Sequence, residues 1–442
     1  MSFFQIEGGN PLKGKVKLSG AKNAAIKMIV ASLLTDEDVI LEDVPEISDV
    51  EVDIEILRSL GVEALYIRPN VLKLSSKKIH SYEVFKELSS KSRASILLLG
   101  PLLYRFGKAK IYELGGCKIG SRPLDRHINA LKTLGARIDY SGGAYTAESS
   151  GRLVGASVVF EKVTVMGTEN VILSSVLGIG KTRIIGAALE PEVDDLILLL
   201  TKMGAKIARS LDGAGRNTIE VEGVDNLKGA THSIIPDRNE AVTFALAGSV
   251  TQGDIVIENA RPKDLIAFLA KIQQAGVDYE VSENSLRVWR EEGTKLKSLD
   301  LVTAPHPGFM TDWQQPFSVL LCLAEGVSTI HETVYSDRFE YTKELNRMGA
   351  KISLYHPVAA PSVYSFSDYT EEGLYAASIS GPTDLRGRRL TVVDLRAGAT
   401  LVLAALSAKG KSEVYGVELI DRGYERFEEK LKGLGAFIER KS

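Results

Sequence analysis

The sequence predicts an α/β fold of the α+β kind, made of six related units that form two bundles of three. A pattern of the form Leu-x-x-Leu/Met-Gly-Ala/Val recurs along the chain, and a degraded copy ends at Val277. Units of about seventy residues are too long for a solenoid repeat, and two bundles of three would bury their helices better than a ribbon of six. The glycines of the six copies are Gly61, Gly135, Gly204, Gly276, Gly349 and Gly435.

Each unit is expected to contain two helices and several strands. The repeated glycine is typical of the residue that ends a helix in a left-handed conformation, and a strand pattern such as Ala136–Tyr140 follows it. A second helix, turn and β-rich strand recur within each unit, as at Gly178–Ala187. Residues 355–378 lengthen the interval between the last two repeated glycines, Gly349 and Gly435. Because they are rich in proline and small polar residues, we expect a surface insertion.

Composition excludes several classes of protein. The 442 residues include 54 Lys and Arg against 57 Asp and Glu, so no bulk field favours nucleic acid or an anionic membrane. Two cysteines cannot form a disulfide framework, and no apolar run reaches the roughly 18 residues that span a bilayer. The first residues lack the features of a signal peptide. We therefore expect a cytoplasmic protein without a nucleic-acid or membrane partner.

Basic side chains recur where the first helix of a unit is predicted to begin. The aligned positions are Lys22, Arg93, Thr168, Arg238, Asp312 and Arg396. A helix N-terminus carries partial positive charge, so a cation there is unfavourable unless an anion binds as well. The pattern favours anionic ligands. The alternative is that each cation pairs with a carboxylate of the chain. Asp312 breaks the series and is a candidate base.

A glycine-rich basic stretch surrounds one of the two cysteines. Arg122 and Arg126 would favour the thiolate of Cys117, which could make it reactive. Cys322 lies in an apolar helical run and is expected to be inert core. The six histidines lack ligand spacing, and neither CxxC nor HExxH occurs, so we expect no metal site.

Several motifs together resemble the family of UDP-N-acetylglucosamine 1-carboxyvinyltransferases. The likeness runs from Ile6 to Ile438, and its motifs are SGAKNAA (19–25), RASILLLGPL (93–102), GGCKIGSRPLD (115–125), TAPHPGFMTDWQ (303–314) and DRGYERFEEKL (421–431). The resemblance implies two inside-out α/β barrel domains, each of three βαβαββ repeats with helices inside, and an active site in the cleft between the domains. It places residues 22–232, with the Cys117 loop, in the first barrel. Residues 1–21 and 233–442 form the second.

The resemblance also implies a reaction. The enolpyruvyl group of phosphoenolpyruvate would pass to the 3′-hydroxyl of UDP-N-acetylglucosamine with release of phosphate, the first committed step of peptidoglycan biosynthesis. Such a transferase would serve cell wall biogenesis, cell shape, the cell cycle and cell division, and would be a fosfomycin target. The reaction needs these two small-molecule substrates and no cofactor.

Site residues follow from the motifs that match. Catalytic roles are implied for Cys117, as proton donor to the enol methylene, and for Asp312, Lys22, Arg396 and Arg422. Phosphoenolpyruvate contacts are implied for Lys22, Asn23, Arg122, Arg338, Arg396 and Arg422. UDP-N-acetylglucosamine contacts are implied for Arg93, Arg122, Pro123, Leu124, Asp125, Arg126, Lys162, Val163, Thr164, Val165, Asp312 and Val334.

Two other functions stay open at this point. A paralogue could transfer enolpyruvyl to a different nucleotide or to a shikimate-type acceptor, in which case phosphate release would need that acceptor. An inactive homologue could bind a UDP-sugar and serve regulation. The presence of Lys22, Cys117, Asp312, Arg396 and Arg422 argues against the second of these.

Overall fold

The structure, a computed structural model, describes residues 2–112, 114–115, 120 and 123–441. Its contacts divide the chain into two compact units. The described residues among 2–19, 120 and 236–441 form what we call the Asp312 unit, and those among 20–115 and 123–235 form the Lys22 unit. No helix in the described part of the chain is both long and apolar enough to cross a membrane.

Each unit contains three four-stranded sheets with one common topology. In every sheet an edge strand pairs in parallel with its neighbour, and the other two pairings are antiparallel. The Lys22 unit has the strand orders β14(Ala230–Ser233)-β3(Val39–Glu42)-β5(Val71–Ser75)-β4(Glu63–Arg68), β6(Glu83–Val84)-β7(Lys108–Tyr112)-β9(Ala144–Glu148)-β8(Arg137–Ser141) and β10(Ser157–Val159)-β11(Lys181–Ile185)-β13(Asn217–Glu222)-β12(Lys206–Leu211). The Asp312 unit has β16(Asp278–Ser282)-β17(Ser285–Trp289)-β15(Asp254–Glu258)-β2(Lys13–Lys17), β18(Asp300–Val302)-β19(Gly326–His331)-β21(Ala376–Gly381)-β20(Lys351–Tyr355) and β22(Arg389–Thr391)-β23(Lys411–Tyr415)-β1(Phe3–Glu7)-β24(Phe437–Lys441).

Two helices accompany each sheet, which confirms the predicted βαβαββ repeat. The first helices are α1(Lys22–Ala31) with η1(Ser32–Leu34), η2(Arg93–Leu98) with α4(Leu99–Phe106), α6(Val165–Ser175), α8(Arg238–Val250), α10(Thr311–Cys322) and α12(Leu395–Ser407). The second helices are α2(Ser48–Leu60), α5(Asp125–Thr133), α7(Pro191–Lys202), α9(Ile266–Gln274), α11(Tyr341–Arg347) and α13(Phe427–Gly433). Short helices connect them at α3(Lys86–Ser89), η3(Pro262–Asp264), η4(Pro361–Val363) and η5(Val417–Leu419).

The repeated glycines end the second helices, as predicted. All six have positive φ, between 89° and 107°, a conformation that costs glycine little because it has no Cβ. They separate α2, α5, α7, α9, α11 and α13 from the strands β4, β8, β12, β16, β20 and β24.

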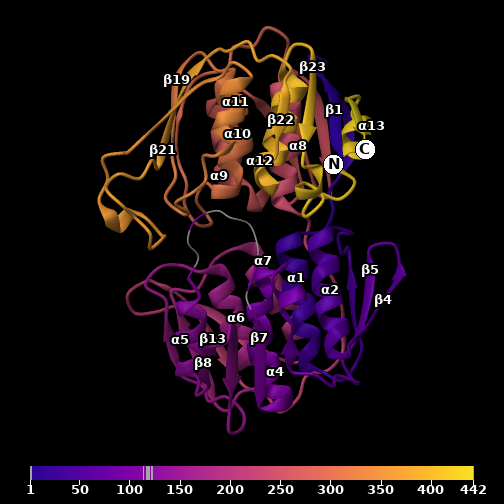
Figure 1. Cartoon of the computed structure of the whole chain (residues 1–442), viewed down its shortest axis with the longest axis vertical. Helices are drawn as coiled ribbons and strands as arrows, with labels where there is room; N and C mark the ends of the chain where they lie inside the picture. The colour runs from indigo at the N-terminus through magenta and orange to yellow at the C-terminus, as the bar shows by residue number, and fades with distance from the viewer. Residues whose placement is uncertain (1, 113, 116–119, 121–122, 442) are drawn as a thin grey trace. The chain divides into compact units, whose positions relative to one another are not determined.

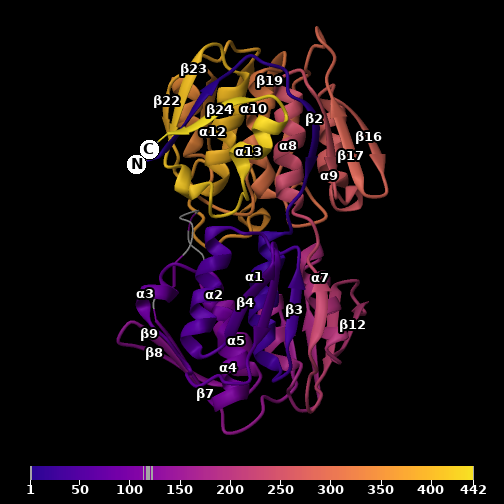
Figure 2. The same cartoon turned by 90° about the vertical axis from the view of Figure 1, so that its right-hand side faces the viewer.

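The helices lie inside and the sheets outside, which is the predicted inside-out arrangement. In the Asp312 unit α8, α10 and α12 pack against one another. Figure 1 shows them between β19 and β21 on one flank and β22, β23 and β1 on the other. In the Lys22 unit, Figure 2 shows β8 and β9 on one flank and β12 on the other, with α1, α2, α4 and α5 among them. Every residue of α8 is buried, and Asp312 is the only residue of α10 that is not.

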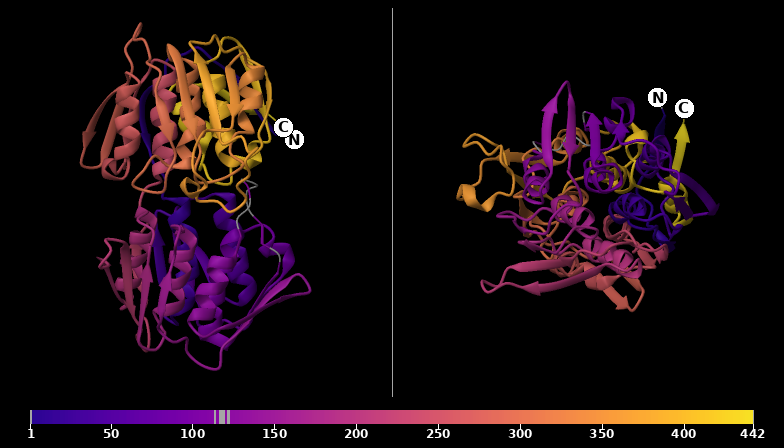
Figure 3. Two further views of the ribbon diagram at one scale, coloured as in Figure 1. Left: turned by 90° about the vertical axis from the view of Figure 1, so that its left-hand side faces the viewer. Right: turned by 90° about the horizontal axis from the view of Figure 1, so that it is seen from below.

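Residues 356–375 lie at the surface without strands or α-helices, as predicted, and they also have a small core of their own. We call them the aromatic insert. Tyr364, Phe366 and Tyr375 are buried in a cluster separate from the main core of the unit. The insert is the orange excursion beyond β19 and β21 in Figure 1, and it also stands out from the strands in the right-hand view of Figure 3. The tyrosines that supply this core lie among the polar residues that predicted a loop.

The first strand of the chain completes the last sheet. Phe4 and Ile6 of β1 are fully buried, and Ile6 lies opposite Ser412 in β23 and Ile438 in β24. Figure 2 shows the two chain ends together at this sheet. The Asp312 unit therefore depends on side chains from the opposite end of the sequence.

We expect Ile6→Ala to lower the free energy of unfolding by about 2–5 kcal/mol, because it leaves a cavity in a fully buried site. Urea unfolding followed by circular dichroism measures the change. Glu7→Ala is the matched control, since Glu7 lies next to it on the exposed face of β1. If Ile6→Ala lowered the free energy of unfolding no more than Glu7→Ala does, the Ile6 side chain would add nothing to the core.

Candidate functional site

The structure brings three of the predicted site residues together around one carboxylate. Arg338 Nη2 donates to Asp312 Oδ1 at 2.8 Å, and Arg396 Nε donates to Asp312 Oδ2 at 3.2 Å. The Asp312 side chain is 23% exposed, whereas the two arginines are 2% and 6% exposed. The carboxylate is thus the part of this group that a ligand can reach most easily.

Helix starts position the group. Asp312 and Arg396 are the second residues of α10 and α12. Asp394 caps α12, because its carboxylate accepts the backbone N–H groups of Arg396 and Ala397 at 2.8 and 3.0 Å. Burial disfavours the Arg396 cation, but Tyr424 and Asp312 more than offset this, and the pKa of Arg396 is raised. Arg396 therefore stays charged.

The group can bind a further anion. The Arg338 Nε–H is buried and makes no hydrogen bond to any residue that the structure describes. A buried donor without a partner is unfavourable, and a ligand carboxylate or phosphate would satisfy it. Burial disfavours the Arg338 cation too, but the charges of Asp312, Asp394 and Glu332 more than offset this and raise its pKa.

A buried glutamate that the sequence did not reveal organises the same region. Glu332 Oε1 accepts the backbone N–H groups of Val334 and Tyr335 at 2.7 and 3.1 Å. Its Oε2 accepts the hydroxyl of Thr311, the first residue of α10, at 2.8 Å. The Thr303 hydroxyl donates to Oε1 at 2.9 Å. Glu332 therefore joins the segment containing Val334 to the start of α10, one residue before Asp312.

In the Lys22 unit, two predicted phosphoenolpyruvate contacts begin α1. The N-terminus of α1 has no side-chain cap, and Lys22 and Asn23 are its first residues. Lys22 Nζ lies 2.5 Å from Asp49 Oδ2 on α2. The Asn23 carbonyl accepts a hydrogen bond from the buried Lys27 Nζ at 2.5 Å. Lys27 in turn pairs with Glu169, 3.5 Å away. An anion at this helix start would compete with Asp49 for Lys22.

The predicted UDP-sugar contacts of the Lys22 unit also lie at helix starts. Arg93 begins η2, and Thr164 caps α6 by accepting the Gly167 N–H at 3.2 Å. Arg126, near the start of α5, approaches the Val163 carbonyl, with Nη1 and O 3.5 Å apart. The structure therefore brings the segments before α5 and α6 together. The other members of this set lie in the same two segments: Pro123, Leu124, Asp125, Lys162 and Val165.

Three predicted site residues are not placed with these groups. Cys117 and Arg122 lie outside the described residues. Arg422 lies in the turn after η5. Gly120, in the same stretch, is described. It lies so close to Ser336 that a Cβ atom at this position would be only 2.2 Å from the Ser336 hydroxyl oxygen.

The register of one helix start differs from the prediction. Thr168 was aligned with Lys22 as a helix start, but α6 begins at Val165, so Thr168 lies one turn inside it. Thr164 is the actual cap, and the Thr168 hydroxyl donates to the Thr164 carbonyl at 2.8 Å.

The alternative interpretation, that the cations at helix starts pair with carboxylates of the chain, also holds for some of them. Lys22 pairs with Asp49 and Arg396 pairs with Asp312, whereas Arg238 Nη1 lies 3.2 Å from His306 Nδ1. Cys322 is fully buried, and burial raises its thiol pKa to about 12, which confirms the expected inert core position.

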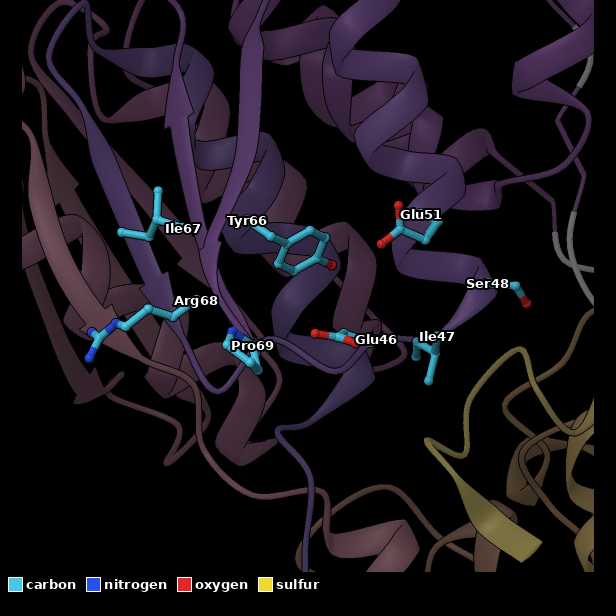
Figure 4. A pocket seen from close by; sticks show the side chains of 8 residues that line it. All are labelled: Glu46, Ile47, Ser48, Glu51, Tyr66, Ile67, Arg68 and Pro69. Atoms are coloured by element: carbon cyan, nitrogen blue, oxygen red, sulfur yellow. The ribbon is translucent and has the colours of Figure 1, made fainter. Parts of the chain in front are cut away.

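A hollow of 630 Å³ opens elsewhere in the Lys22 unit. None of its lining residues is a predicted site residue, and its two glutamates disfavour an anionic ligand; the lining side chains are Glu46, Ile47, Ser48, Glu51, Tyr66, Ile67, Arg68 and Pro69 (Figure 4). Within the described ranges, no cluster of three or more His, Cys, Asp or Glu side chains could hold a metal ion.

Comparison with known proteins connects this geometry to a family. The family model for EPSP synthase (3-phosphoshikimate 1-carboxyvinyltransferase) matches residues 6–431. A UDP-N-acetylglucosamine 1-carboxyvinyltransferase of Campylobacter hominis is 41% identical over 444 residues and covers 100% of both chains. One of Sorangium cellulosum is 44% identical and covers 99% of this chain and 98% of its own length.

Solved structures agree on the fold. The enolpyruvyl transferase NikO from Streptomyces tendae matches with a TM-score of 0.85 at 23% identity, over 99% of this chain and 98% of that one. An EPSP synthase from Acinetobacter baumannii matches with a TM-score of 0.74 at 18% identity, over 100% of both chains.

Asp53, one turn after Asp49 on α2, is expected to make stability depend on pH. Burial raises its pKa from 3.8 to about 7, although a hydrogen bond from Ser92 opposes the shift. Between about pH 4 and 7 the folded state holds a proton that the unfolded state has lost, so the free energy of unfolding falls as pH rises. At about 1.4 kcal/mol per pKa unit, the loss attributable to Asp53 is at most about 4 kcal/mol.

Urea unfolding of the wild type and Asp53→Asn across this pH range measures that loss. The free energy of unfolding of the wild type minus that of Asp53→Asn should fall steadily from pH 4 to pH 7 and stay constant above pH 7. Asp225→Asn, at an exposed aspartate of the same unit, is the control. Parallel curves for wild type and Asp53→Asn would contradict the assignment.

Proposed function

This chain belongs to the enolpyruvyl transferase family that includes the UDP-N-acetylglucosamine 1-carboxyvinyltransferases, and we propose that it transfers the enolpyruvyl group of phosphoenolpyruvate to the 3′-hydroxyl of UDP-N-acetylglucosamine. Phosphate is released. The observation that carries the proposal is Asp312 held between Arg338 and Arg396, with the carboxylate as the exposed member. Such a group can receive a hydroxyl proton and bind an anion at the same place.

Each substrate suits charged groups at helix starts. Phosphoenolpyruvate carries a phosphate and a carboxylate. Lys22 would supply a point charge to it, whereas Arg338 and Arg396 could bind either anion through parallel N–H donors. The diphosphate of the UDP-sugar suits the uncapped N–H groups at the start of α5 and the cations Arg93 and Arg126. Arg122 and Arg422 complete the proposed sets.

The proposed mechanism is addition followed by elimination. Cys117 protonates the methylene carbon of phosphoenolpyruvate, which gives C2 oxocarbenium character. The sugar oxygen then bonds to C2 as its proton passes to Asp312, and a tetrahedral intermediate that keeps the phosphate forms. In the elimination, the Cys117 thiolate takes a proton from C3, which restores the double bond, breaks the C2–O bond to phosphate and regenerates the thiol. The arginines stabilise the departing phosphate, and one such donor contributes roughly 3–4 kcal/mol in enzymes where it has been removed.

The finer parts of the proposal concern the setting. We place the reaction in the cytoplasm, at the first committed step of peptidoglycan biosynthesis, with consequences for cell shape, the cell cycle and cell division. The full-length likeness to relatives named for this activity supports that setting. Fosfomycin sensitivity follows if Cys117 is the reactive thiol.

Phosphate release from purified protein tests the reaction directly. We expect phosphate only when phosphoenolpyruvate and UDP-N-acetylglucosamine are both present, and none when 3-phosphoshikimate replaces the UDP-sugar. Asp312→Asn should lower kcat by about 10²–10⁴-fold, because the amide cannot accept the hydroxyl proton. Asp384→Asn, at an exposed aspartate of the same unit, should leave kcat unchanged. Turnover with 3-phosphoshikimate alone would reassign the acceptor, and no turnover with either would make the chain an inactive homologue.

Fosfomycin tests the role of the loop cysteine. The epoxide should alkylate Cys117 and abolish turnover. Cys117→Asp should remain active yet resist the drug, because a carboxylic acid can also donate the proton but reacts poorly with the epoxide. Cys322→Ala, at the buried second cysteine, should stay sensitive. A drug-sensitive Cys117→Asp variant would mean that another residue is alkylated. Mass spectrometry of the treated proteins would identify the modified position.

A further inference from the structure

We propose that the aromatic insert, residues 356–375, positions Arg338 and Asp312, and that Asp368 and Ser336 form the contact through which it acts. The kinetic part of this inference rests on the proposed function, whereas the structural part does not. The sequence predicts only a surface insertion here, so the contacts of the insert with the site decide whether it has a role in the reaction.

Packed aromatic rings hold the insert together. The ring of Tyr364 lies 5.0 Å from Phe366, 4.9 Å from Tyr369 and 5.1 Å from Tyr375, measured between centroids. The Tyr375 hydroxyl accepts the Thr370 N–H at 2.9 Å. Packed aromatic rings and a closed hydrogen bond restrict the motion of a segment that has almost no regular secondary structure. Such a body can hold a neighbouring segment in place.

Four contacts join the insert to residues 331–338. The Ser336 hydroxyl donates to Asp368 Oδ2 at 2.7 Å, and the Ser365 N–H donates to the Thr333 carbonyl at 2.7 Å. The hydroxyl of the buried Tyr364 lies 3.1 Å from Nε2 of His331, which ends β19. At the other end of the insert, the Tyr375 carbonyl accepts the Glu332 N–H at 2.8 Å. The insert therefore holds the segment at several points along its length.

Residues 332–338 lead directly to the charged group. They form most of the connection between β19 and α11 and have no regular structure. Gln314 and Gln315 of α10 donate to the Arg338 carbonyl at 3.2 and 3.4 Å, whereas no helix or strand includes the residues before it in this segment. Glu332 holds the segment from the core side, and the insert holds it from the other side. Two residues after Ser336, the Arg338 guanidinium reaches Asp312 Oδ1 and also donates to the Thr311 carbonyl at 3.3 Å. A shift of Ser336 would therefore move Arg338 relative to Asp312.

A matched pair of variants elsewhere in the unit provides the control. Thr329, also on β19, donates its hydroxyl to Asp300 at 2.5 Å, which is another bond between a hydroxyl and a carboxylate. That bond is exposed, and its members are not in residues 331–338. Thr329→Ala and Asp300→Ala therefore remove the same kind of contact without touching the insert.

The experiment combines hydrogen exchange with kinetics in the full-length protein. We expect Ser336→Ala and Asp368→Ala each to speed amide exchange in residues 333–338, whereas Thr329→Ala and Asp300→Ala do not. We expect the first pair to raise KM for phosphoenolpyruvate or UDP-N-acetylglucosamine by about 3–10-fold, because a net hydrogen bond contributes about 0.5–1.5 kcal/mol. The double variant Ser336→Ala/Asp368→Ala should match the single ones, since each substitution removes the same contact.

KM separates a positioning role from a structural one. A smaller folded fraction lowers the apparent kcat and leaves KM unchanged. Unchanged exchange in residues 333–338, or faster exchange with unchanged KM, would overturn the proposal. Additive effects in the double variant would also overturn it. If the wild type has no turnover, the proposed function fails, and the exchange data then decide separately whether the insert holds the segment.

Discussion

Three buried helices of the Asp312 unit can present polar groups only where they begin. α8, α10 and α12 pack together inside sheets, and their side chains are almost all excluded from solvent. Their first turns meet. The Arg396 guanidinium of α12 reaches Asp312 of α10, and Arg238 of α8 lies 5.9 Å from the ring of Trp313. The inside-out fold therefore gathers charged side chains at the ends of apolar helices, where unpaired N–H groups already favour anions.

The charges in this structure also balance one another. Lys22 has Asp49 as its partner, and Arg338 and Arg396 share Asp312. A cation beside a helix N-terminus would be unfavourable in the absence of any counter-charge, and the carboxylates supply it. These contacts are partly exposed at Lys22, Asp49 and Asp312. Anionic ligands would therefore exchange one set of ion pairs for another, which costs less than burying new charge.

Most of the fold could be predicted from the sequence, because each repeat ends a helix with the same glycine. A left-handed backbone is a local property, so spacing alone located six helix ends. Helix starts were less certain: the alignment of the repeats points to Thr168, but α6 begins one turn earlier, after its cap Thr164. Proline and small polar residues predict the insert at the surface, but its aromatic core forms only in three dimensions, because the aromatic residues are separated in sequence by polar ones.

The candidate site likewise contains some residues that could be predicted from the sequence and some that could not. Basic residues at aligned helix starts pointed to Lys22, Arg93 and Arg396 without knowledge of the structure. Glu332 had no comparable signal. It follows β19, a strand of mixed polar and apolar residues, and only the fold reveals that four donors from three segments converge on its carboxylate. Tyr424, beside Arg396, lies in a motif matched by resemblance, but its contact depends on α12 and the chain after η5 packing together.

The order of the strands has a consequence for biosynthesis. β1 and β2 leave the ribosome first, yet their partners β15, β23 and β24 lie in residues 254–441. The Lys22 unit closes its first sheet with β14, at residues 230–233, while the later half of the chain is still being made. β2 can pair once β15 has been made, but nascent β1 keeps unpaired edges until residues 411–441 follow. The last sheet of the Asp312 unit therefore forms late, and β1 is the strand that chaperone contact during synthesis would protect most.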